Sequence, residues 1–362
     1  MKITLIAGAR PNFIKIAPII HAIQKAVHKG SVIAYRLVHT GQHYDEKMSS
    51  TFFKELNIPS PDINLNCGGG TQAEQTAAIL VNFEKELTQN PTDLVLVVGD
   101  VNSTMACAIV AKKLNTKVAH VEAGIRSFDI SMPEEINRMV TDSITDYFFT
   151  TSQTANTNLK NEGIKEDQIF YVGNVMIDTL LKNESRFKKP VFYDELNLKN
   201  SSYFVLTLHR PANVDQSKKL KLVLKEIVNN TKGLPIIFPV HPRTAKVFKD
   251  LDFSATNLKI VEPLGYLEFN YLVKNSKAVI TDSGGITEET TVMGIPCLTL
   301  RDNTERPETI TIGTNVLVGT DHDNLKPILE KLLSGNWKEG AIPEKWDGKT
   351  AERIIAILSK TL

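Results

Sequence analysis

Residues 281–289 have the composition of a turn that could bind a phosphate group through its backbone. They read Thr-Asp-Ser-Gly-Gly-Ile-Thr-Glu-Glu and follow the apolar run Ala278–Ile280. The run predicts a buried strand, and two glycines followed by helix formers predict a turn that opens into a helix. The amide groups of Ser283, Gly284 and Gly285 would then face an anion, with no Cβ of the glycines to block it. An ordinary strand-to-helix turn is the alternative for this segment alone.

Acidic side chains in the first half of the chain stand where proton transfer could use them. Asp100 follows an apolar run and a glycine, and Glu122 ends the next apolar run. Burying a carboxylate is costly unless it is paired or functional, so Glu122 is a candidate acid or base. Glu134 and Glu135 open a predicted helix. Simpler alternatives are a helix N-cap for Asp100 and a favourable helix dipole for the glutamate pair.

Basic side chains lie beside other predicted strand ends. Arg10 and Lys15 border the helix that follows the first strand, and Arg306 precedes a proline in the second half. Guanidinium groups can bind phosphate bidentately, so a phosphate contact is one interpretation and a solvated charge is the other. His209 ends a strand beside Arg210. Two neighbouring cations favour an anionic ligand, although a structural histidine is the alternative.

Composition and missing motifs exclude several classes of protein. Lys and Arg number 42 against 41 Asp and Glu, which does not suggest a nucleic-acid or membrane surface. Three distant cysteines (Cys67, Cys107 and Cys297) form neither a disulfide framework nor a zinc motif, so we expect no metal. The chain has no GxxxxGK[ST] motif and no GxGxxG after its first strand, which excludes a P-loop NTPase and argues against bound NAD. With no export signal or membrane-spanning run, a cytoplasmic protein is expected.

Short apolar runs alternate with helical patterns along the whole chain. Such alternation predicts an α/β fold with two doubly wound, Rossmann-like domains. We expect an N-terminal domain over residues 1–172 and a C-terminal domain over 173–344, with a final helix in 345–362 that could pack back on the first. The expected strands are Ile3–Ala7, Tyr35–Thr40, Leu94–Val98, Lys117–Val121 and Tyr147–Thr150, then Tyr203–Leu208, Pro235–Val240, Lys259–Val261, Ala278–Thr281 and Pro296–Leu300.

Ligands of open α/β sheets bind at the carboxyl ends of the strands. The polar residues described above follow such strand ends in both halves, as does His241, a weaker candidate. The pattern therefore predicts a substrate cleft between two domains.

The ordered set of these segments resembles the non-hydrolysing UDP-N-acetylglucosamine 2-epimerases, which have the two-domain GT-B fold. The most specific part is Asp-Ser-Gly-Gly-Ile-x-Glu-Glu followed by Thr-Glu-Arg-Pro-Glu. The segments that carry the resemblance are Gly8–Asn12 with Lys15, Thr40–Gln42, Gly99-Asp100, His120–Gly124, Pro133–Arg138, Gly173-Asn174, His209-Arg210, Thr281–Glu289 and Arg301–Glu308.

The resemblance implies reversible inversion at C2, which interconverts UDP-N-acetylglucosamine and UDP-N-acetylmannosamine without a cofactor. Expulsion of UDP would give 2-acetamidoglucal, and UDP would then add back while the other face of C2 is protonated. Two faces require at least two proton-transfer groups. Asp100, Glu122 and Glu134 would serve as that set, with the assignment of each to a face left open, and His209 would stabilise the departing diphosphate.

The resemblance also implies how the nucleotide sugar is held. Arg10, Lys15 and the amides of the glycine turn would share the diphosphate charge. Glu289 would hold the ribose, Phe269 would lie beside the uracil, and Arg306 would contact the sugar nucleotide. The family further implies a homodimer with a UDP-sugar as its small-molecule partner.

Three other activities fit parts of the same pattern. A GT-B glycosyltransferase would use the same fold and phosphate turn but needs an acceptor. A hydrolysing epimerase would release UDP and free sugar. An epimerase for a different UDP-2-acetamido sugar is the third, because the sequence departs from the common family pattern after Arg210, between Arg126 and Pro133, and at Leu264. A non-catalytic nucleotide-sugar sensor, which would bind without turnover, is a further alternative.

Overall fold

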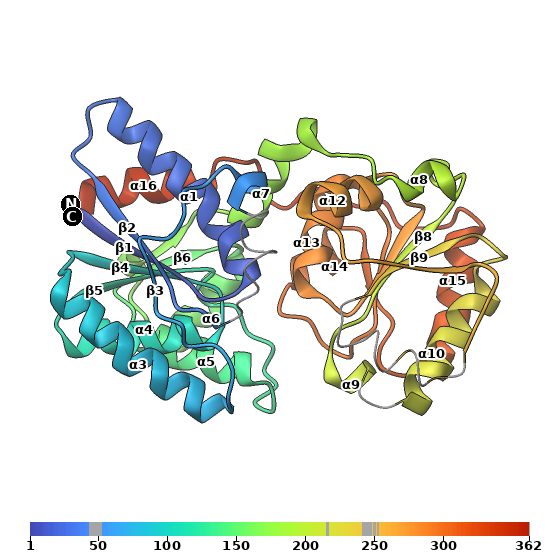
Figure 1. Ribbon diagram of the computed structural model, residues 1–362, viewed down its shortest axis with the longest axis horizontal. Helices are drawn as coiled ribbons and strands as arrows, with labels where there is room; N and C mark the ends of the chain where they lie inside the picture. The colour runs from blue at the N-terminus through green and yellow to red at the C-terminus, as the bar shows by residue number, and fades with distance from the viewer. Residues whose placement is uncertain (43–52, 215–216, 241–247, 249–250, 252, 362) are drawn as a thin grey trace. The chain divides into compact units, whose positions relative to one another are not determined.

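A computed structural model describes residues 1–42, 53–214, 217–240, 248, 251 and 253–361 (Figure 1). The chain forms two compact units, Met1–Lys182 with Glu344–Leu362, and Asn183–Pro343. The division falls later than the boundary expected at residue 172. Most of α7 (Val175–Asn183) belongs to the first unit, where Thr179 donates a hydrogen bond to the Ile14 carbonyl at 2.7 Å.

The first unit contains a seven-stranded sheet in the order β3-β2-β1-β4-β5-β6-β7. Every neighbouring pair is parallel. The chain moves outward from β1 to β3 and returns to β4, so the β1–β4 pair is the topological switch point where open α/β sheets bind ligands. The strands are β1 (Lys2–Ala7), β2 (Ala34–His39), β3 (Ile63–Asn64), β4 (Leu94–Val98), β5 (Lys117–Val121), β6 (Tyr147–Thr150) and β7 (Ile169–Tyr171).

Helices cover both faces of this sheet. Figure 1 shows α1 and α16 on one face and α3, α4 and α5 on the other. The helices of the unit, besides α7, are α1 (Arg10–His28), α3 (Gln72–Gln89), α4 (Asn102–Lys113), α5 (Pro133–Ser143), α6 (Gln153–Asn161) and α16 (Thr350–Thr361), and a short 3₁₀ turn spans Glu166–Gln168.

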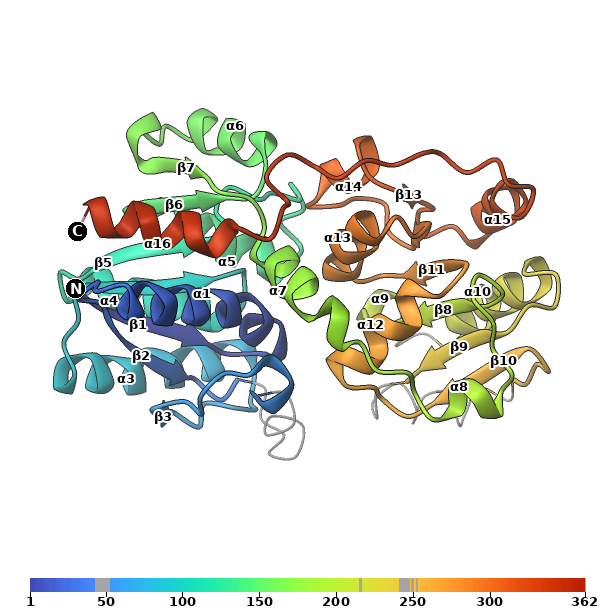
Figure 2. The same cartoon turned by 90° about the horizontal axis from the view of Figure 1, so that it is seen from above.

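The C-terminal helix packs with the first unit. α16 lies beside α1, as Figure 2 shows from above. Its first turn is held by Asp178 of α7, whose carboxylate accepts hydrogen bonds from the amides of Thr350 and Ala351 at 3.1 and 2.7 Å. Acidic groups stabilise a helix N-terminus in this way.

The second unit contains a six-stranded parallel sheet in the order β10-β9-β8-β11-β12-β13. Its switch point is the β8–β11 pair. The strands are β8 (Phe204–Thr207), β9 (Ile236–Pro239), β10 (Leu258–Val261), β11 (Ala278–Thr281), β12 (Cys297–Thr299) and β13 (Asn315–Leu317). The helices are α8 (Phe192–Glu195), α9 (Pro211–Val214), α10 (Ser217–Asn230), α12 (Tyr266–Lys274), α13 (Gly284–Met293), α14 (Pro307–Thr311) and α15 (Leu325–Leu333), with 3₁₀ turns at Glu184–Arg186 and His322–Asn324.

Alternate residues of β8 build the core on its two faces. Phe204 and Leu206 pack with α10 and α15, whereas Val205 packs with α8 and α12. All three side chains are fully buried. This two-sided burial explains why the strand is a continuous apolar run in the sequence. The loop that carries His241 lies outside the described residues.

Candidate active site

The carboxyl-end edge of the first sheet carries a buried ion pair between Glu122 and Lys15. Glu122 follows β5, and its Oε2 lies 2.6 Å from Nζ of Lys15 on α1. Both side chains are at least nine-tenths buried. The lysine stem passes over Gly99, because a Cβ built there would lie 2.8 Å from Nζ. The loops after β1, β4 and β5 therefore meet at this point.

Glu122 also has an unusual backbone. Its φ is +73°, a left-handed conformation that costs a non-glycine residue roughly 1–3 kcal/mol. The amides of Glu122 and Ala123 both donate to the Phe149 carbonyl, at 3.0 and 3.2 Å. Gly124 follows with φ +75°, and a Cβ there would lie 2.4 Å from the Ala155 carbonyl oxygen. Tight packing of the chain after β5 thus holds the Glu122 carboxylate in a strained position.

Asp100, after β4, is paired with Arg138 of α5. Nη1 of Arg138 lies 2.5 Å from Oδ2 of Asp100, while its Nη2 lies 2.6 Å from Oε2 of Glu135. Val101, not Asp100, occupies the N-cap position of the helix that follows, so the N-cap alternative for Asp100 is wrong. The Asp100 carboxylate faces a cation instead and is 28% exposed.

The two glutamates that open α5 have different surroundings. Glu135 is buried and accepts hydrogen bonds from the amides of Ser127 and Phe128, at distances from 2.8 to 3.1 Å. These bonds, with Arg138, keep the pKa of Glu135 below its usual value although burial raises it. Glu134 is exposed. The structure therefore assigns Glu135 to holding the loop before α5 and leaves Glu134 accessible.

Arg10 is the first residue of α1, at the N-terminus of the helix that follows the first strand. The turn before it is held by Asn12, whose Oδ1 accepts from the amides of Gly8 and Ala9 at 3.1 and 2.9 Å. Nδ2 of Asn12 donates to the Val98 carbonyl at 3.0 Å. Asn12 thus ties the loop after β1 to the end of β4.

In the second unit, β11 leads through Asp282 and Ser283 into α13, which begins at Gly284. The predicted strand–turn–helix is confirmed. The Ser283 amide donates to Oγ1 of Thr281 at 3.0 Å, so one of the three amides expected to face an anion is already bonded within the turn. Gly284 and Gly285 are first-turn residues, whose amides have no acceptor within the helix.

His209 follows β8 and is oriented by Asp282. Its Nδ1 lies 2.7 Å from Oδ1 of Asp282, and its side chain is 57% exposed. Asp282 is fully buried and also accepts from the Arg210 amide and from Asn213, both at 3.0 Å. Burial raises the pKa of Asp282, but His209, Asn213 and Arg210 together hold it below its usual value. The outer face of the imidazole remains available to a ligand.

Two glutamates of α13 have buried partners. Oε1 of Glu289 accepts a hydrogen bond from the Tyr266 hydroxyl at 2.8 Å, and Glu288 forms an ion pair with Arg306. Phe269, one turn after Tyr266 on α12, is half-buried against the core. Glu289 and Phe269 thus lie on helices that the hydroxyl of Tyr266 connects.

A second buried ion pair lies beside the glycine turn. Both Nη atoms of Arg301 contact Glu305, at 2.8 and 2.7 Å. A Cβ built on Gly284 would lie 3.8 Å from Nη1 of Arg301. Oε2 of Glu305 would lie at the same distance, so the turn is flanked by a neutral ion pair.

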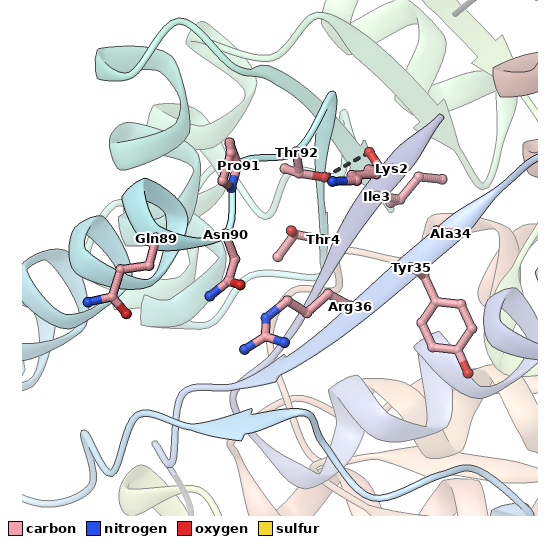
Figure 3. Close-up of a pocket in the computed structure, with 10 residues that line it drawn as sticks. All are labelled: Lys2, Ile3, Thr4, Ala34, Tyr35, Arg36, Gln89, Asn90, Pro91 and Thr92. Carbon is pink, nitrogen blue, oxygen red and sulfur yellow. Dashed lines mark hydrogen bonds between the residues drawn. The ribbon is translucent and has the colours of Figure 1, made fainter.

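A pocket opens at the opposite, amino-end edge of the first sheet (Figure 3). It is formed by the starts of β1 and β2 and the loop before β4. Arg36 in its lining is paired with Glu86 at 2.5 Å, and Thr92 donates to the Lys2 carbonyl at 2.7 Å. None of the candidate residues lies there, and we assign it no role.

Within the described part of the chain, no helix is long and apolar enough to cross a membrane. Among the same residues, one group of acidic and histidine side chains is close enough together to be considered for a metal, the consecutive Asp321, His322 and Asp323. The two acids are exposed, and the group is separate from the residues described above.

The partners of the candidate residues could not be found from sequence alone. Arg138 and Asp282 were visible only as parts of motifs, and their contacts span 38 and 73 residues of chain. The buried pair His120 and Asp142 is separated by 22 residues. The one signal for these partners in the sequence is a polar residue near a predicted strand end or on a helix face that is expected to be buried.

Two parallel α/β sheets of Rossmann type, each with candidate residues at its carboxyl end, place the chain in the GT-B structural class. The family described as UDP-N-acetylglucosamine 2-epimerase matches residues 25–359. The chain is 45% identical to the UDP-N-acetylglucosamine 2-epimerase of Methanocaldococcus jannaschii, with 99% of both chains covered. The crystal structure of that enzyme with UDP-GlcNAc and UDP has a TM-score of 0.89, covering 99% of this chain and 100% of the other.

A second relative is named for a sugar that is substituted differently from N-acetylglucosamine. The chain is 42% identical to the UDP-2,3-diacetamido-2,3-dideoxy-D-glucuronate 2-epimerase of Pseudomonas aeruginosa, covering 89% of this chain and 90% of that protein. The chain belongs to the UDP-N-acetylglucosamine 2-epimerase family. The expected family and fold class are confirmed.

Proposed function

We propose that the protein interconverts UDP-N-acetylglucosamine and UDP-N-acetylmannosamine. In a chain of this family, the observation that carries the proposal is the set of carboxylates at the switch point of the first sheet. Asp100 and Glu122 are each paired with a cation. Glu134 belongs to the same unit, and its side chain is exposed. Membership of an epimerase family argues against the glycosyltransferase alternative.

The reaction needs these groups because the C2 hydrogen is not adjacent to a carbonyl. Cleavage of the C1–O bond sends its electron pair to UDP and makes C2 acidic. A carboxylate takes the C2 proton, leaving the C1–C2 double bond of 2-acetamidoglucal. UDP then adds back at C1 while a carboxylic acid delivers a proton to the opposite face of C2. Oxidation state does not change, so the chemistry requires no redox cofactor.

We assign proton transfer to Asp100, Glu122 and Glu134 as a set. Arg138 and Lys15 hold the carboxylates of Asp100 and Glu122 in place through ion pairs, which suits groups that must meet C2 in a defined geometry. Glu134 is exposed, which suits exchange of its proton with solvent. Which group serves which face stays open.

The second unit would bind the UDP moiety. The first-turn amides of α13, at Gly284 and Gly285, suit the diphosphate, and Ser283 adds its hydroxyl. Glu289 would accept from the ribose hydroxyls, with Phe269 beside the uracil. Arg306, already paired with Glu288, would contact the sugar nucleotide.

His209 and the cations of the first unit would share the charge of the departing diphosphate. The Asp282 carboxylate fixes the His209 ring with one nitrogen turned outward, as an electrostatic stabiliser requires. Arg10 would add its guanidinium. Lys15 has three donors, so it could contact the diphosphate while keeping its bond to Glu122.

We further propose that the protein acts as a homodimer. The family resemblance implies this state, and α5 exposes Ile136 and Met139 on its surface. Sedimentation analysis of the purified protein tests it. A monomer across the concentration range of the activity assay would contradict the proposal.

Product analysis tests the proposed function. The purified protein is incubated with UDP-N-acetylglucosamine alone, without NAD, metal or acceptor, and the products are separated by anion exchange. We expect UDP-N-acetylmannosamine at equilibrium with substrate. Free sugar with UDP would indicate the hydrolysing alternative. No product, together with turnover of a UDP-2,3-diacetamido sugar, would favour the alternative named for the Pseudomonas relative.

A further inference from the structure

A fully buried imidazole lies directly behind the two strand ends that carry Asp100 and Glu122. His120 is the fourth residue of β5, and its side chain has no exposed surface. Its Nδ1 lies 2.7 Å from Oδ1 of Asp142 on α5, and its Nε2 lies 2.8 Å from the Gly99 carbonyl oxygen. One ring thus contacts both the helix that carries Glu134 and the residue before Asp100.

Both atoms that face the ring are hydrogen-bond acceptors. A carboxylate oxygen and a backbone carbonyl can only accept, so each ring nitrogen must carry a proton to make its bond. A neutral imidazole has one proton and would leave one nitrogen lone pair facing an oxygen. The geometry therefore requires an imidazolium at His120.

The charges around the ring agree with that state. Asp142 also pairs with Arg126 at 2.7 Å, and Arg126 makes a bidentate contact with Glu162 at 2.7 and 2.6 Å. Glu162 is 39% exposed, so Asp142 is the buried anion that faces both Arg126 and the His120 ring.

The cluster fixes two loops at once. The second carboxylate oxygen of Asp142 accepts from the Gly124 amide at 3.0 Å, two residues after Glu122. The Gly99 amide in turn donates to the Val121 carbonyl at 3.0 Å. The strained backbone at Glu122 is therefore held on one side by Phe149 and on the other by Asp142.

We propose that His120 is a positioning residue that carries a proton on each ring nitrogen and, through Asp142 and Gly99, fixes the Asp100 and Glu122 carboxylates for proton transfer. The ring touches neither carboxylate and no substrate. Its effect on catalysis would come from the placement of the two loops, where small displacements of reacting groups lower rates strongly. The kinetic consequence rests on the proposed epimerisation, whereas the protonation state does not.

Nitrogen-15 NMR of the histidine side chains tests the protonation state in the intact protein. At pH 8, where exposed histidines are neutral, we expect one ring with a proton on both nitrogens and slow solvent exchange because it is buried. His39 offers an internal comparison, since it too is buried but burial lowers its pKa. If every histidine ring had one nitrogen without a proton, the proposal would be wrong.

Two variants test the positioning role. His120→Asn can keep the bond to Asp142 and His120→Gln can keep the bond to Gly99, so each removes one of the two contacts. We expect kcat to fall about tenfold or more in both, with KM changed by less than about threefold. The matched control is His28→Asn, at an exposed histidine near the end of α1, which should leave kcat unchanged.

The outcomes separate this proposal from the proposed function. Wild-type kcat in both folded variants would overturn positioning even if the ring is protonated. If a variant does not fold, the NMR result on the wild-type protein decides the protonation state. A wild-type protein that binds UDP but converts no substrate would contradict the proposed epimerisation. The NMR measurement would still decide the protonation of His120.

Discussion

The switch points of the two sheets use charge in different ways. At the first, the candidate carboxylates Asp100 and Glu122 are held by Arg138 and Lys15, and side chains provide all the chemistry. At the second, Arg301 and Arg306 are each paired with a buried glutamate, and the groups we assign to the diphosphate are backbone amides, the Ser283 hydroxyl and the outward nitrogen of His209. We therefore assign proton transfer to the first unit and most of the UDP binding to the second, although both sheets are parallel and doubly wound.

The difference shows how one fold can provide both proton-transfer groups and an anion-binding site. Proton transfer needs groups whose ionisation is controlled by specific neighbours, which long side chains on helices supply. Anion binding needs donors that stay charged or polar at every pH, which helix N-termini supply at little entropic cost. Each prediction below would break or sharpen this division.

The largest effect is expected from removing a carboxylate at the first switch point. Glu122→Gln keeps the shape but cannot take a proton, so turnover should fall by about 10²- to 10⁴-fold, while UDP affinity changes little. Asp100→Asn and Glu134→Gln should behave alike, and Glu135→Gln should instead lower thermal stability. Initial rates and UDP titration calorimetry measure the two quantities. A wild-type rate in any of the first three variants removes that residue from the mechanism.

A smaller loss of turnover is expected from Asp282→Asn in the second unit. The change leaves a buried amide where the His209 ring is now held, so the ring loses its fixed orientation. We expect kcat to fall about tenfold, as for loss of one charge-assisted hydrogen bond worth about 1.5 kcal/mol. The control is Asp302→Asn, at an exposed carboxylate bonded to Thr320. Equal rates for both variants would show that His209 needs no orientation.

The glycine turn should respond in affinity for UDP. Gly284→Ala adds a Cβ whose nearest protein atoms are 3.8 Å away, so the fold accepts it. We expect UDP affinity to fall about tenfold because the methyl group faces the approaching phosphate, and Gly285→Val should weaken it further. Calorimetry measures the affinity and thermal unfolding provides the check on folding. An unchanged affinity in both variants would mean that the turn is only structural.

The smallest effects concern two glutamates near Arg306 that should change stability with opposite signs. Burial raises the pKa of Glu305, but Arg301 outweighs it and holds that pKa at about 2. Burial raises the pKa of Glu308 to about 7, and Glu288 adds to the shift. Ionised Glu305 therefore stabilises the fold at neutral pH, whereas ionising Glu308 costs stability.

Glu305→Gln should destabilise the protein by roughly 1–3 kcal/mol at pH 7, and the difference should shrink as pH falls below about 4 toward 2. Glu308→Gln should be equal to wild type near pH 4 and more stable than wild type by a comparable amount above pH 7. Urea unfolding at a series of pH values measures both. Parallel curves for the two variants would contradict the contrast between these residues.

Much of the scaffold could be predicted because long apolar runs are buried on both faces. β4, β5, β6 and β11 have the predicted bounds, and most other expected strands differ by one or two residues. The short edge strands β3, β7 and β13 were missed, since two or three residues of mixed polarity carry no periodic signal.

The candidate site shows a similar limit. The residues at strand ends could be predicted, because position after a buried strand is visible in sequence. Their partners could not, since Lys15 and Glu122 are separated by 107 residues and only the folded chain brings them together. Sequence also could not separate Glu134 from Glu135, because the amides that occupy Glu135 become neighbours only when the preceding loop folds.

Proton NMR of the reaction in D₂O tests the central claim that the first unit exchanges a proton at C2. Wild-type protein is mixed with UDP-N-acetylglucosamine, and the C1 and C2 signals of both sugars are followed. We predict UDP-N-acetylmannosamine that carries deuterium at C2 from its first appearance, with the exchange lost in Glu122→Gln. Product that retains hydrogen at C2, or deuterium exchange at an undiminished rate in that variant, would contradict the account.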